Sequence, residues 1–344
     1  MSRTRLLPDR FDHMAATVPH PADHAAPLPT FSVVVPNYNH AHYLEAALHA
    51  HLSQSVPPLE ILVVDDASTD DSCAVVERVA AKHPSVRLVR LPRNGGVNAA
   101  INRGLHEACG DYVHVSAADD VVMPQFAARS LDVAAAYPDA GFCFSDPAVT
   151  MGDSGVVEPS PLALSPHPRL FSPADLERYL NRAHLGIPTY TVLYRRDALL
   201  ALGGFVDELR WWADTFASLV LALRHGACYV PEVLVVFRVR ASSYSQRGAR
   251  DTAAQRDVIN RVVDLLDSPA YRDVAPALRA SGVLPRLRFR VMLWLLASPR
   301  HRRHLTPRLV TRVLVGGTWW VLKPFIPQQM RPAVRRLAHS WVRF

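Results

Sequence analysis

Short apolar runs alternate with amphipathic stretches over the first half of the chain. Four runs rich in Val, Ile, Leu and Tyr have the length and composition of buried strands: 31–35, 61–64, 86–91 and 112–115. Apolar residues recur at helical spacing between and after these runs: 41–52, 72–82, 97–108 and 124–136. The alternation predicts an α/β fold in which a mostly parallel sheet carries helices on both faces.

The pattern becomes less regular in the second half. It predicts a strand at 141–144 and then a long loop at 147–170, which contains Pro, Ser and Gly. Three more elements follow: a strand at 190–194, a helix at 214–224 and a strand at 228–236. After about residue 250 the apolar residues follow helical spacing and the charged residues are mostly basic. We therefore expect a flexible leader at 1–30, a main α/β domain at 31–245 and a helical basic C-terminal region at 246–344.

Charge is distributed unevenly between these parts. The 344 residues include 38 Lys and Arg and 31 Asp and Glu, a formal net charge of +7. The last acid is Asp273 and 14 cations follow it, so the first 273 residues hold 24 cations and 31 acids, a net charge of −7. Four of the six Trp also lie in the tail. A basic tail with Trp predicts an anionic membrane surface as a partner, and a helical subdomain packed on the main domain is the alternative. Nucleic acid is not expected, because the chain has no recognised nucleic-acid motif.

Other features of the sequence bear on where the protein works. The chain has four scattered cysteines without CxxC spacing, which excludes a disulfide framework and suits a reducing compartment. It shows no secretory signal and no stretch of 18 uncharged apolar residues, so we expect no transmembrane helix. Together with the basic tail, this predicts a cytoplasmic protein, peripheral on the inner face of a membrane if the tail binds lipid.

Polar residues gather where three predicted strands end. The segments are Pro36-Asn37-Tyr38-Asn39, Asp65-Asp66-Ala67-Ser68 and Ala117-Ala118-Asp119-Asp120. Ligands of open parallel sheets bind at the carboxyl edge of the strands, so these segments are the candidate site. Adjacent carboxylates repel each other and need a cation, strong donors or solvent. The chain lacks GxGxxG after its first strand and lacks GxxxxGK[ST], so neither phosphate-binding loop is supported.

Four segments resemble glycosyltransferase family 2, whose members have a GT-A fold. They occur in the family's order: FSVVVPNYNHAHYLEAAL, LEILVVDDASTDDS, RNGGVNAAINRGLHEACGDYVHVSAADDVVMP and GGFVDELRWWADTFASLVLALRHG. The resemblance runs from about Phe31 to Ser245. It implies a Rossmann-like GT-A domain that binds a nucleotide-sugar donor of the UDP or dTDP type. The sugar would pass to an acceptor hydroxyl with inversion.

The resemblance also implies a set of donor-binding residues. Asp66 would accept a hydrogen bond from the pyrimidine base and Asp65 would shape the pocket. The remaining candidates for the nucleotide pocket are Pro36, Asn37, Tyr38, Asn94 and Asn102. For Pro36 and Tyr38 the alternative is turn and core packing, and for Asn102 it is hydrogen bonding to backbone from a helix face.

The resemblance also implies a divalent metal cofactor, Mn²⁺ or Mg²⁺, with Asp119 and Asp120 as its ligands. Asp119 would in addition lie at the diphosphate of the donor. Hard oxygen ligands suit either ion. The sequence departs from the family pattern at Ala117, where a further Asp is expected. The alternative for Asp119 is a helix cap.

The later segment supplies the remaining catalytic candidates. The resemblance makes Asp214 the catalytic base, with an N-cap as the alternative, and here Ala213 replaces the family's Glu. Trp211 and Trp212 are candidates for stacking on the acceptor, with core packing as the alternative. Arg238 and Arg240 are candidates for binding the diphosphate of the donor, and the alternative is that they are solvated surface residues. Arg240 stands where many relatives have His.

The resulting hypothesis is a metal-assisted hexosyltransferase that acts in glycan, envelope polysaccharide or glycosylated metabolite biosynthesis. Its partners would be a nucleotide-sugar donor and a glycan, lipid-linked or small-molecule acceptor. The alternative is a catalytically weak sugar-nucleotide-binding scaffold of an envelope-assembly complex, favoured by Ala117, Ala213 and Arg240. A nucleotidyltransferase of the same fold is a third possibility, but residues 36–42 contain neither the Gly nor the Arg or Lys that its loop needs.

Overall fold

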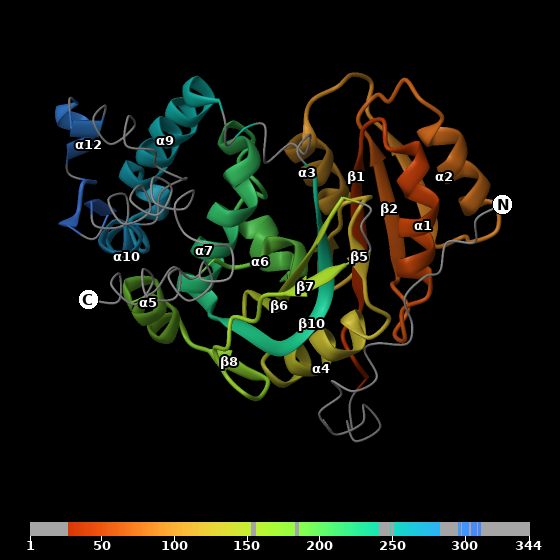
Figure 1. Ribbon diagram of the computed structural model, residues 1–344, viewed down its shortest axis with the longest axis horizontal. Helices are drawn as coiled ribbons and strands as arrows, with labels where there is room; N and C mark the ends of the chain where they lie inside the picture. The colour runs from red at the N-terminus through yellow and green to blue at the C-terminus, as the bar shows by residue number, and fades with distance from the viewer. Residues whose placement is uncertain are drawn as a thin grey trace.

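The fold is built around one ten-stranded mixed sheet (Figure 1). The computed structural model describes residues 27–152, 156–182, 186–240, 248, 251–282, 295–296, 298–302, 304–307 and 309–310. Its strands are β1 (Phe31–Asn37), β2 (Glu60–Asp65), β3 (Val86–Arg90), β4 (Tyr112–Val115), β5 (Val121–Val122), β6 (Phe142–Met151), β7 (Val157–Pro159), β8 (Arg169–Phe171), β9 (Leu193–Arg195) and β10 (Ala227–Val239). The main path through the sheet is β3-β2-β1-β4-β9-β6-β10-β5, with β7 on β6 and β8 on β10.

The two halves of the sheet differ in strand direction. Strands β3, β2, β1 and β4 are all parallel, with Asn37 of β1 opposite Asp65 of β2. Strand β9 is antiparallel to β4 and β6, and β5, β7 and β8 also pair antiparallel. The long curved β10 is parallel to β6 (Figure 1). The α/β class is thus confirmed, while the expected parallel arrangement describes the first half and the β6–β10 pair.

Helices cover both faces of the sheet, as the sequence predicts. The helices are α1 (Ala41–Leu52), α2 (Ser72–Ala80), α3 (Val97–Glu107), α4 (Phe126–Ala136), α5 (Pro173–Arg182), α6 (Arg196–Ala201), α7 (Ala213–His225), α9 (Thr252–Asp267), α10 (Ala275–Ser281) and α12 (Pro299–Arg302). Alternate residues of the strands face opposite sides because side chains alternate along a strand. Val33 and Val35 pack with α1, α2 and α4, whereas Val34 packs in the core formed with α3, α5, α6, α7, α9 and α10.

Two stretches differ from the sequence-based expectation. The stretch 147–170, predicted as a loop, contains the end of β6, all of β7 and the start of β8. Pro147 suggested a strand end because it has no N–H to donate, but β6 passes through it opposite Val235 of β10. The strand predicted at 190–194 is the 3₁₀ helix η2 (Thr189–Thr191) followed by β9.

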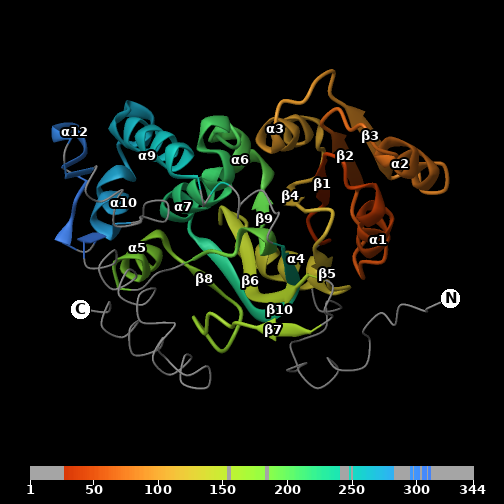
Figure 2. The same cartoon turned by 45° about the horizontal axis from the view of Figure 1, so that its top comes forward.

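The α9–α10 region lies beside α5 and α7, at the opposite end of the molecule from α1 and α2 (Figures 1 and 2). Val258 and Leu278 are buried in the same core as α7, which fits the expected helical character after residue 250. Most of the basic tail, including all of 311–344, lies outside the described residues, as do residues 1–26 of the expected leader. Within the described part, no helix is long and apolar enough to cross a membrane.

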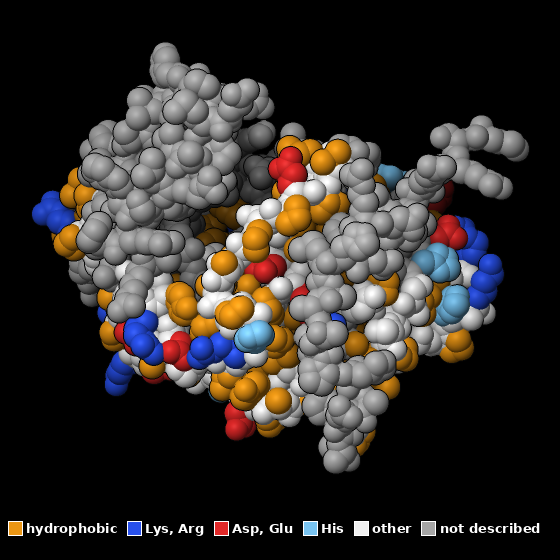
Figure 3. Space-filling view, turned by 60° about the horizontal axis from the view of Figure 1, so that its bottom comes forward, with side chains coloured by type: hydrophobic (Ala, Val, Ile, Leu, Met, Phe, Trp, Pro, Cys, Tyr) orange, Lys and Arg blue, Asp and Glu red, His pale blue; other side chains and the backbone are white. Residues whose placement is uncertain are grey.

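Charged side chains are unevenly spread over the surface. On the face shown in Figure 3, Lys, Arg and His side chains gather at the end formed by α1 and α2. Arg78 of α2 lies beside His49 of α1 and beside Lys82 and His83, which follow α2.

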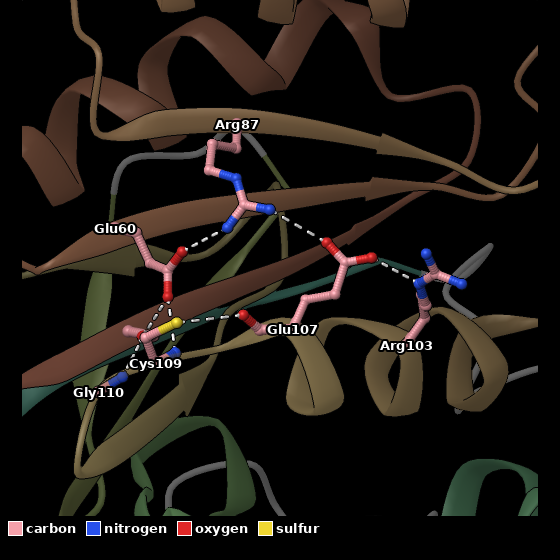
Figure 4. Close-up of polar contacts among 7 residues, drawn as sticks. Glu60, Arg87, Arg103, Glu107, Cys109 and Gly110 are labelled. Atoms are coloured by element: carbon pink, nitrogen blue, oxygen red, sulfur yellow. Dashed lines mark hydrogen bonds and ion pairs between the residues drawn. The ribbon is translucent and has the colours of Figure 1, made fainter.

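A buried acid joins the parallel strands at their N-terminal edge (Figure 4). Glu60, only 7% exposed, accepts hydrogen bonds from the Ser32 hydroxyl (3.0 Å) and the Cys109 backbone N–H (2.7 Å). It also pairs with Arg87 at 2.8 Å, and Arg87 in turn pairs with Glu107. The network fixes the edge of the sheet opposite the polar strand ends. It does not contact the candidate site, and it stabilises the strands that carry that site.

Candidate active site

The ends of β1 and β2 are tied together by side-chain hydrogen bonds. Asn37 is 2% exposed, and its Nδ2 donates to Oδ1 of Asp65 (2.8 Å) and to the Ser68 hydroxyl (3.1 Å). The Ser68 backbone N–H donates to Oδ2 of Asp65 (2.9 Å). Burial alone would raise the pKa of Asp65, but the hydrogen bonds from Ser68 and Asn37 outweigh it and lower the pKa. Asp65 is therefore an ionised group that fixes the loop after β2, and its predicted role in shaping the nucleotide pocket stays a prediction.

The neighbouring residues form the open side of this edge. Pro36 is half-buried, whereas Tyr38 is exposed. Asn39 has a φ of 57°, and its side-chain oxygen accepts from the Thr69 backbone N–H at 2.8 Å. Oδ1 of Asn37 is buried and has no hydrogen-bond partner among the described residues. The edge thus presents one unused acceptor and one exposed aromatic ring.

Asp66 holds the loop that precedes α3. Its Oδ1 accepts from the Gly95 backbone N–H (2.7 Å) and its Oδ2 from the Gly96 N–H (2.8 Å). Gly96 has a φ of 91°, a conformation that side chains rarely adopt, so Gly fits this turn. Asn94 is exposed just before the two glycines. Each carboxylate oxygen has a second lone pair, so Asp66 can still accept from a ligand.

Two asparagines of α3 reach the segment that leads to the predicted base. Asn98 Nδ2 donates to the Arg210 carbonyl at 2.9 Å. Asn102 bonds the Phe205 backbone twice, donating to its carbonyl (2.7 Å) and accepting from its N–H (2.8 Å). Asn102 therefore makes the backbone contacts of the alternative interpretation. The sequence analysis missed Asn98, whose neighbour Asn102 drew attention only through the family pattern.

Arg238 and Arg240, at and just beyond the end of β10, converge on Asp119 and Asp120. Nη2 of Arg240 lies 2.6 Å from Oδ2 of Asp119. The backbone N–H of Arg238 donates to Oδ1 of Asp120 (3.1 Å), and Nε of Arg238 donates to the carbonyl of Asp119 (2.9 Å). Burial and the charge of Asp119 raise the pKa of Asp120 to about 8. The structure thus brings together four predicted residues that are far apart in the sequence.

This arrangement does not fit a metal site well. The Asp119 carboxylate already pairs with a guanidinium, which has no lone pair to offer a metal. Asp120 is 8% exposed and bonded to the Arg238 backbone. Among the described residues, no group of three or more His, Cys, Asp or Glu is placed to hold an ion. A metal at Asp119 would have to displace Arg240 or share the carboxylate with it.

Asp214 lies in the first turn of α7. Its Oδ2 accepts from the Thr189 hydroxyl at 2.6 Å, and its Oδ1 accepts from the Thr215 backbone N–H at 2.5 Å. Burial raises the pKa of Asp214, and the hydrogen bonds from Thr189 and Thr215 offset only part of that rise. A fixed carboxylate with increased proton affinity suits a general base. The capping alternative is wrong in its position, because α7 begins at Ala213 and its N-cap is Trp212, so Asp214 is the second residue of the helix.

The two tryptophans before Asp214 have different surroundings. Trp212 is buried in the core against Phe216, with 6.0 Å between ring centroids, as the core-packing alternative expects. Trp211 is partly buried at the edge of the same core. Of the two, Trp211 therefore has more surface to offer an acceptor.

Aromatic residues that the sequence analysis missed connect these groups. Tyr190 follows Thr189 and stacks on Phe237, which precedes Arg238, with 5.1 Å between ring centroids. Tyr43 of α1 lies below the guanidinium of Arg240 at 4.7 Å. No pattern in the sequence predicts either contact, because each joins segments distant in the chain. Asp214 is thus linked to the Asp119 loop through Thr189 and the stacked pair Tyr190 and Phe237, which precedes Arg238.

Sequence comparison agrees with the segments that form this edge. The family model described as Glycosyl transferase family 2 matches residues 32–203, half of the chain. An uncharacterised protein of Mycobacterium tuberculosis is 28% identical over 295 residues, which cover 80% of this chain and 88% of that protein. An uncharacterised glycosyltransferase of Nostoc sp. is 27% identical over 65% of this chain and 69% of its own length.

Solved structures have the same fold. S. aureus TarS, residues 1–349, in complex with UDP-GlcNAc, superposes with a TM-score of 0.61 at 16% identity, over 91% of this chain and 89% of that one. A mannosyltransferase from Pyrobaculum calidifontis in complex with GDP-Man and Mn²⁺ gives a TM-score of 0.57 at 21% identity, over 94% and 87% of the two chains. At these identities the likeness establishes the fold alone.

Proposed function

The chain belongs to glycosyl transferase family 2, and on that premise we propose that it transfers a sugar from a nucleotide-sugar donor to an acceptor hydroxyl with inversion. The observation that carries the proposal is the match of the family model to the segments whose polar ends meet at one edge of the sheet. A transferase of this family needs a donor pocket and a base, and both have candidate residues at that edge.

The donor side is assigned to the ends of β1 and β2. The two structural neighbours are described with UDP-GlcNAc and GDP-Man, which supports a nucleoside diphosphate sugar as donor. We propose a UDP- or dTDP-sugar, with the base hydrogen-bonded to Asp66. Asn37 has a buried unpaired oxygen that could accept from the nucleoside, and Pro36, Tyr38 and Asn94 would line the pocket.

Asp214 is proposed as the base. It would take the proton of the acceptor hydroxyl while that oxygen attacks the anomeric carbon and the nucleoside diphosphate leaves. A single displacement of this kind needs one base and inverts the configuration. The contacts with Thr189 and Thr215 fix the carboxylate. Trp211 is proposed to stack on the acceptor.

The cofactor proposal concerns a divalent metal at Asp119 and Asp120. The mannosyltransferase neighbour is described with Mn²⁺, which supports a divalent metal as a candidate cofactor in this fold. In this chain Asp119 and Asp120 are the predicted ligands, yet Arg240 already pairs with Asp119. No step of the proposed reaction is therefore assigned to a metal.

The composition of the C-terminal tail supports a proposal for where the protein acts and which acceptor it meets. A glycan, a lipid-linked molecule or a small metabolite could be the acceptor, and 14 cations with four Trp support attachment to an anionic membrane surface. Flotation of the full chain with anionic vesicles at low salt, reversed by high salt, would support membrane attachment. A chain that stays soluble with such vesicles favours the packed-subdomain alternative.

A screen of nucleotide sugars for hydrolysis tests the main proposal. We expect slow release of the nucleoside diphosphate from one donor. The screen is run both with and without Mn²⁺. Binding of UDP, dTDP or GDP without hydrolysis of any donor, and without transfer to hydroxyl acceptors, would favour the scaffold alternative. Absence of both binding and hydrolysis would contradict the donor site itself.

A further inference from the structure

Two guanidinium groups stand where the resemblance expects a metal ion. Arg240 is paired with Asp119 at 2.6 Å, and the side chains of these two residues are 23% and 12% exposed. Arg238 holds the same loop through the carbonyl of Asp119 and through Oδ1 of Asp120. The cluster is therefore fixed by hydrogen bonds and still open to solvent on one side.

Tyr43 supports both cations. The guanidinium carbon of Arg240 lies 4.7 Å from the centroid of the Tyr43 ring, and that of Arg238 lies 5.8 Å from it. A cation over an aromatic face is attracted by the negative charge of that face. Two like charges over one ring repel each other, and Asp119 offsets part of that repulsion. The arrangement keeps positive charge concentrated at the sheet edge.

Guanidinium chemistry matches the anion that a donor would bring. Two guanidiniums together carry the charge of one divalent cation. Each has five N–H donors in a rigid fork that fits phosphate oxygens. The ion pair with Asp119 uses one of the nitrogens of Arg240, and its Nε has no hydrogen-bond partner among the described residues. Asp119 then orients Arg240 and does not need to ligate an ion.

We propose that Arg240, with Arg238, replaces the divalent metal as the positive charge that binds the diphosphate of the donor. Nucleoside diphosphate binding then needs no metal. Arg240 contacts the phosphate oxygens, while Asp119 and Tyr43 are positioning residues. The inference rests on the proposed function, because it presumes that a nucleoside diphosphate binds at this edge.

Isothermal titration calorimetry with UDP, dTDP and GDP tests the proposal on the full chain. For the nucleotide that binds the parent protein, the Kd in EDTA is expected to lie within about twofold of the Kd in Mn²⁺. Arg240→Gln should weaken binding about 10- to 100-fold in EDTA, the effect of losing a charge-assisted contact. Arg240→Lys keeps the charge without the fork, so it should lose less affinity than Arg240→Gln.

Arg103→Gln is the matched control. Arg103 is 56% exposed on α3 and pairs with Glu107 at the other edge of the sheet (Figure 4), so this variant should bind like the parent. A parent affinity that falls more than about tenfold in EDTA and returns with Mn²⁺ would overturn the inference and leave the proposed function intact. If Arg240→Gln does not fold, the comparison of the parent and Arg240→Lys in EDTA decides. If none of the three nucleotides binds the parent in either condition, the proposed function fails as well.

Discussion

Replacing Asp66 by Asn separates its two roles, clamping a loop and binding a nucleotide. The carboxylate accepts from the N–H groups of Gly95 and Gly96, one on each oxygen. An amide has one oxygen, so Asp66→Asn keeps one bond and turns an N–H toward the other glycine. A lost hydrogen bond to a charged group costs about 1.5–3 kcal/mol. Both glycines are partly or fully exposed and can bond to water instead, so we expect the lower value.

The expected loss of stability is therefore about 1.5 kcal/mol, which lowers the melting temperature by roughly 2–5 °C. Nucleotide binding should fall as well, because Asp66 is proposed to accept a hydrogen bond from the base and that bond would also be lost. A loss of about 1.5–3 kcal/mol corresponds to a Kd that is roughly 10- to 150-fold larger. Calorimetry with UDP, dTDP and GDP measures the Kd, and circular dichroism measures the melting temperature.

Asp71→Asn provides the control for Asp66→Asn. Asp71 is an exposed acid of the same loop region, at the start of α2, and its replacement should change neither quantity appreciably. A folded Asp66→Asn protein that melts early but binds the nucleotide as tightly as the parent would show that Asp66 only clamps the loop. The pocket assignment would then be wrong.

Three further predictions concern the base, the core and the opposite edge. Asp214→Asn should reduce turnover about 10²- to 10⁴-fold with nearly parental nucleotide affinity. Steady-state kinetics measures the turnover and calorimetry the affinity, and an unchanged rate would show that Asp214 has only a structural role. Burial lowers the pKa of His51 to about 3 and that of His114 to about 4, from an unfolded value near 6.5. Their contribution to stability is present above about pH 6.5 and is lost as the pH falls through 4 to 3, because the unfolded chain binds these protons first. Urea melts at several pH values would follow this loss, and replacing both His by Gln should flatten it. Glu60→Ala removes the acceptor of the buried Ser32 hydroxyl and of the partly buried Cys109 N–H, so the free energy of unfolding should fall by about 1–3 kcal/mol, and a melt like that of the parent would exclude this role.

The sequence predicts the first half of the fold because that half is built from local periodicity. The helices α1 at Ala41–Leu52 and α3 at Val97–Glu107 are close to the predicted ranges. The polar ends of β1, β2 and β4 meet because parallel strands share a carboxyl edge. These inferences need only strand length, helix spacing and the order of elements.

The second half depends on contacts that periodicity does not encode. Strand β9 enters the sheet between β4 and β6 in the antiparallel direction, and nothing in the run 193–195 specifies its neighbours. The pairing of Arg240 with Asp119 joins the residue that follows β10 to the loop after β4. Family patterns indicated each residue separately, but only the fold shows that one charge faces the other.

The departures from the family pattern can now be compared with their surroundings. Ala213 removes one acid, yet the adjacent Asp214 is held by Thr189 and has a raised pKa, so a candidate base remains. Arg240 removes a metal ligand, yet it adds a cation on the carboxylate where the ion was expected. Both changes alter the charge balance of the site while its remaining groups stay fixed by hydrogen bonds. The site therefore still holds a fixed carboxylate and a cation, the two groups that the proposed transfer requires.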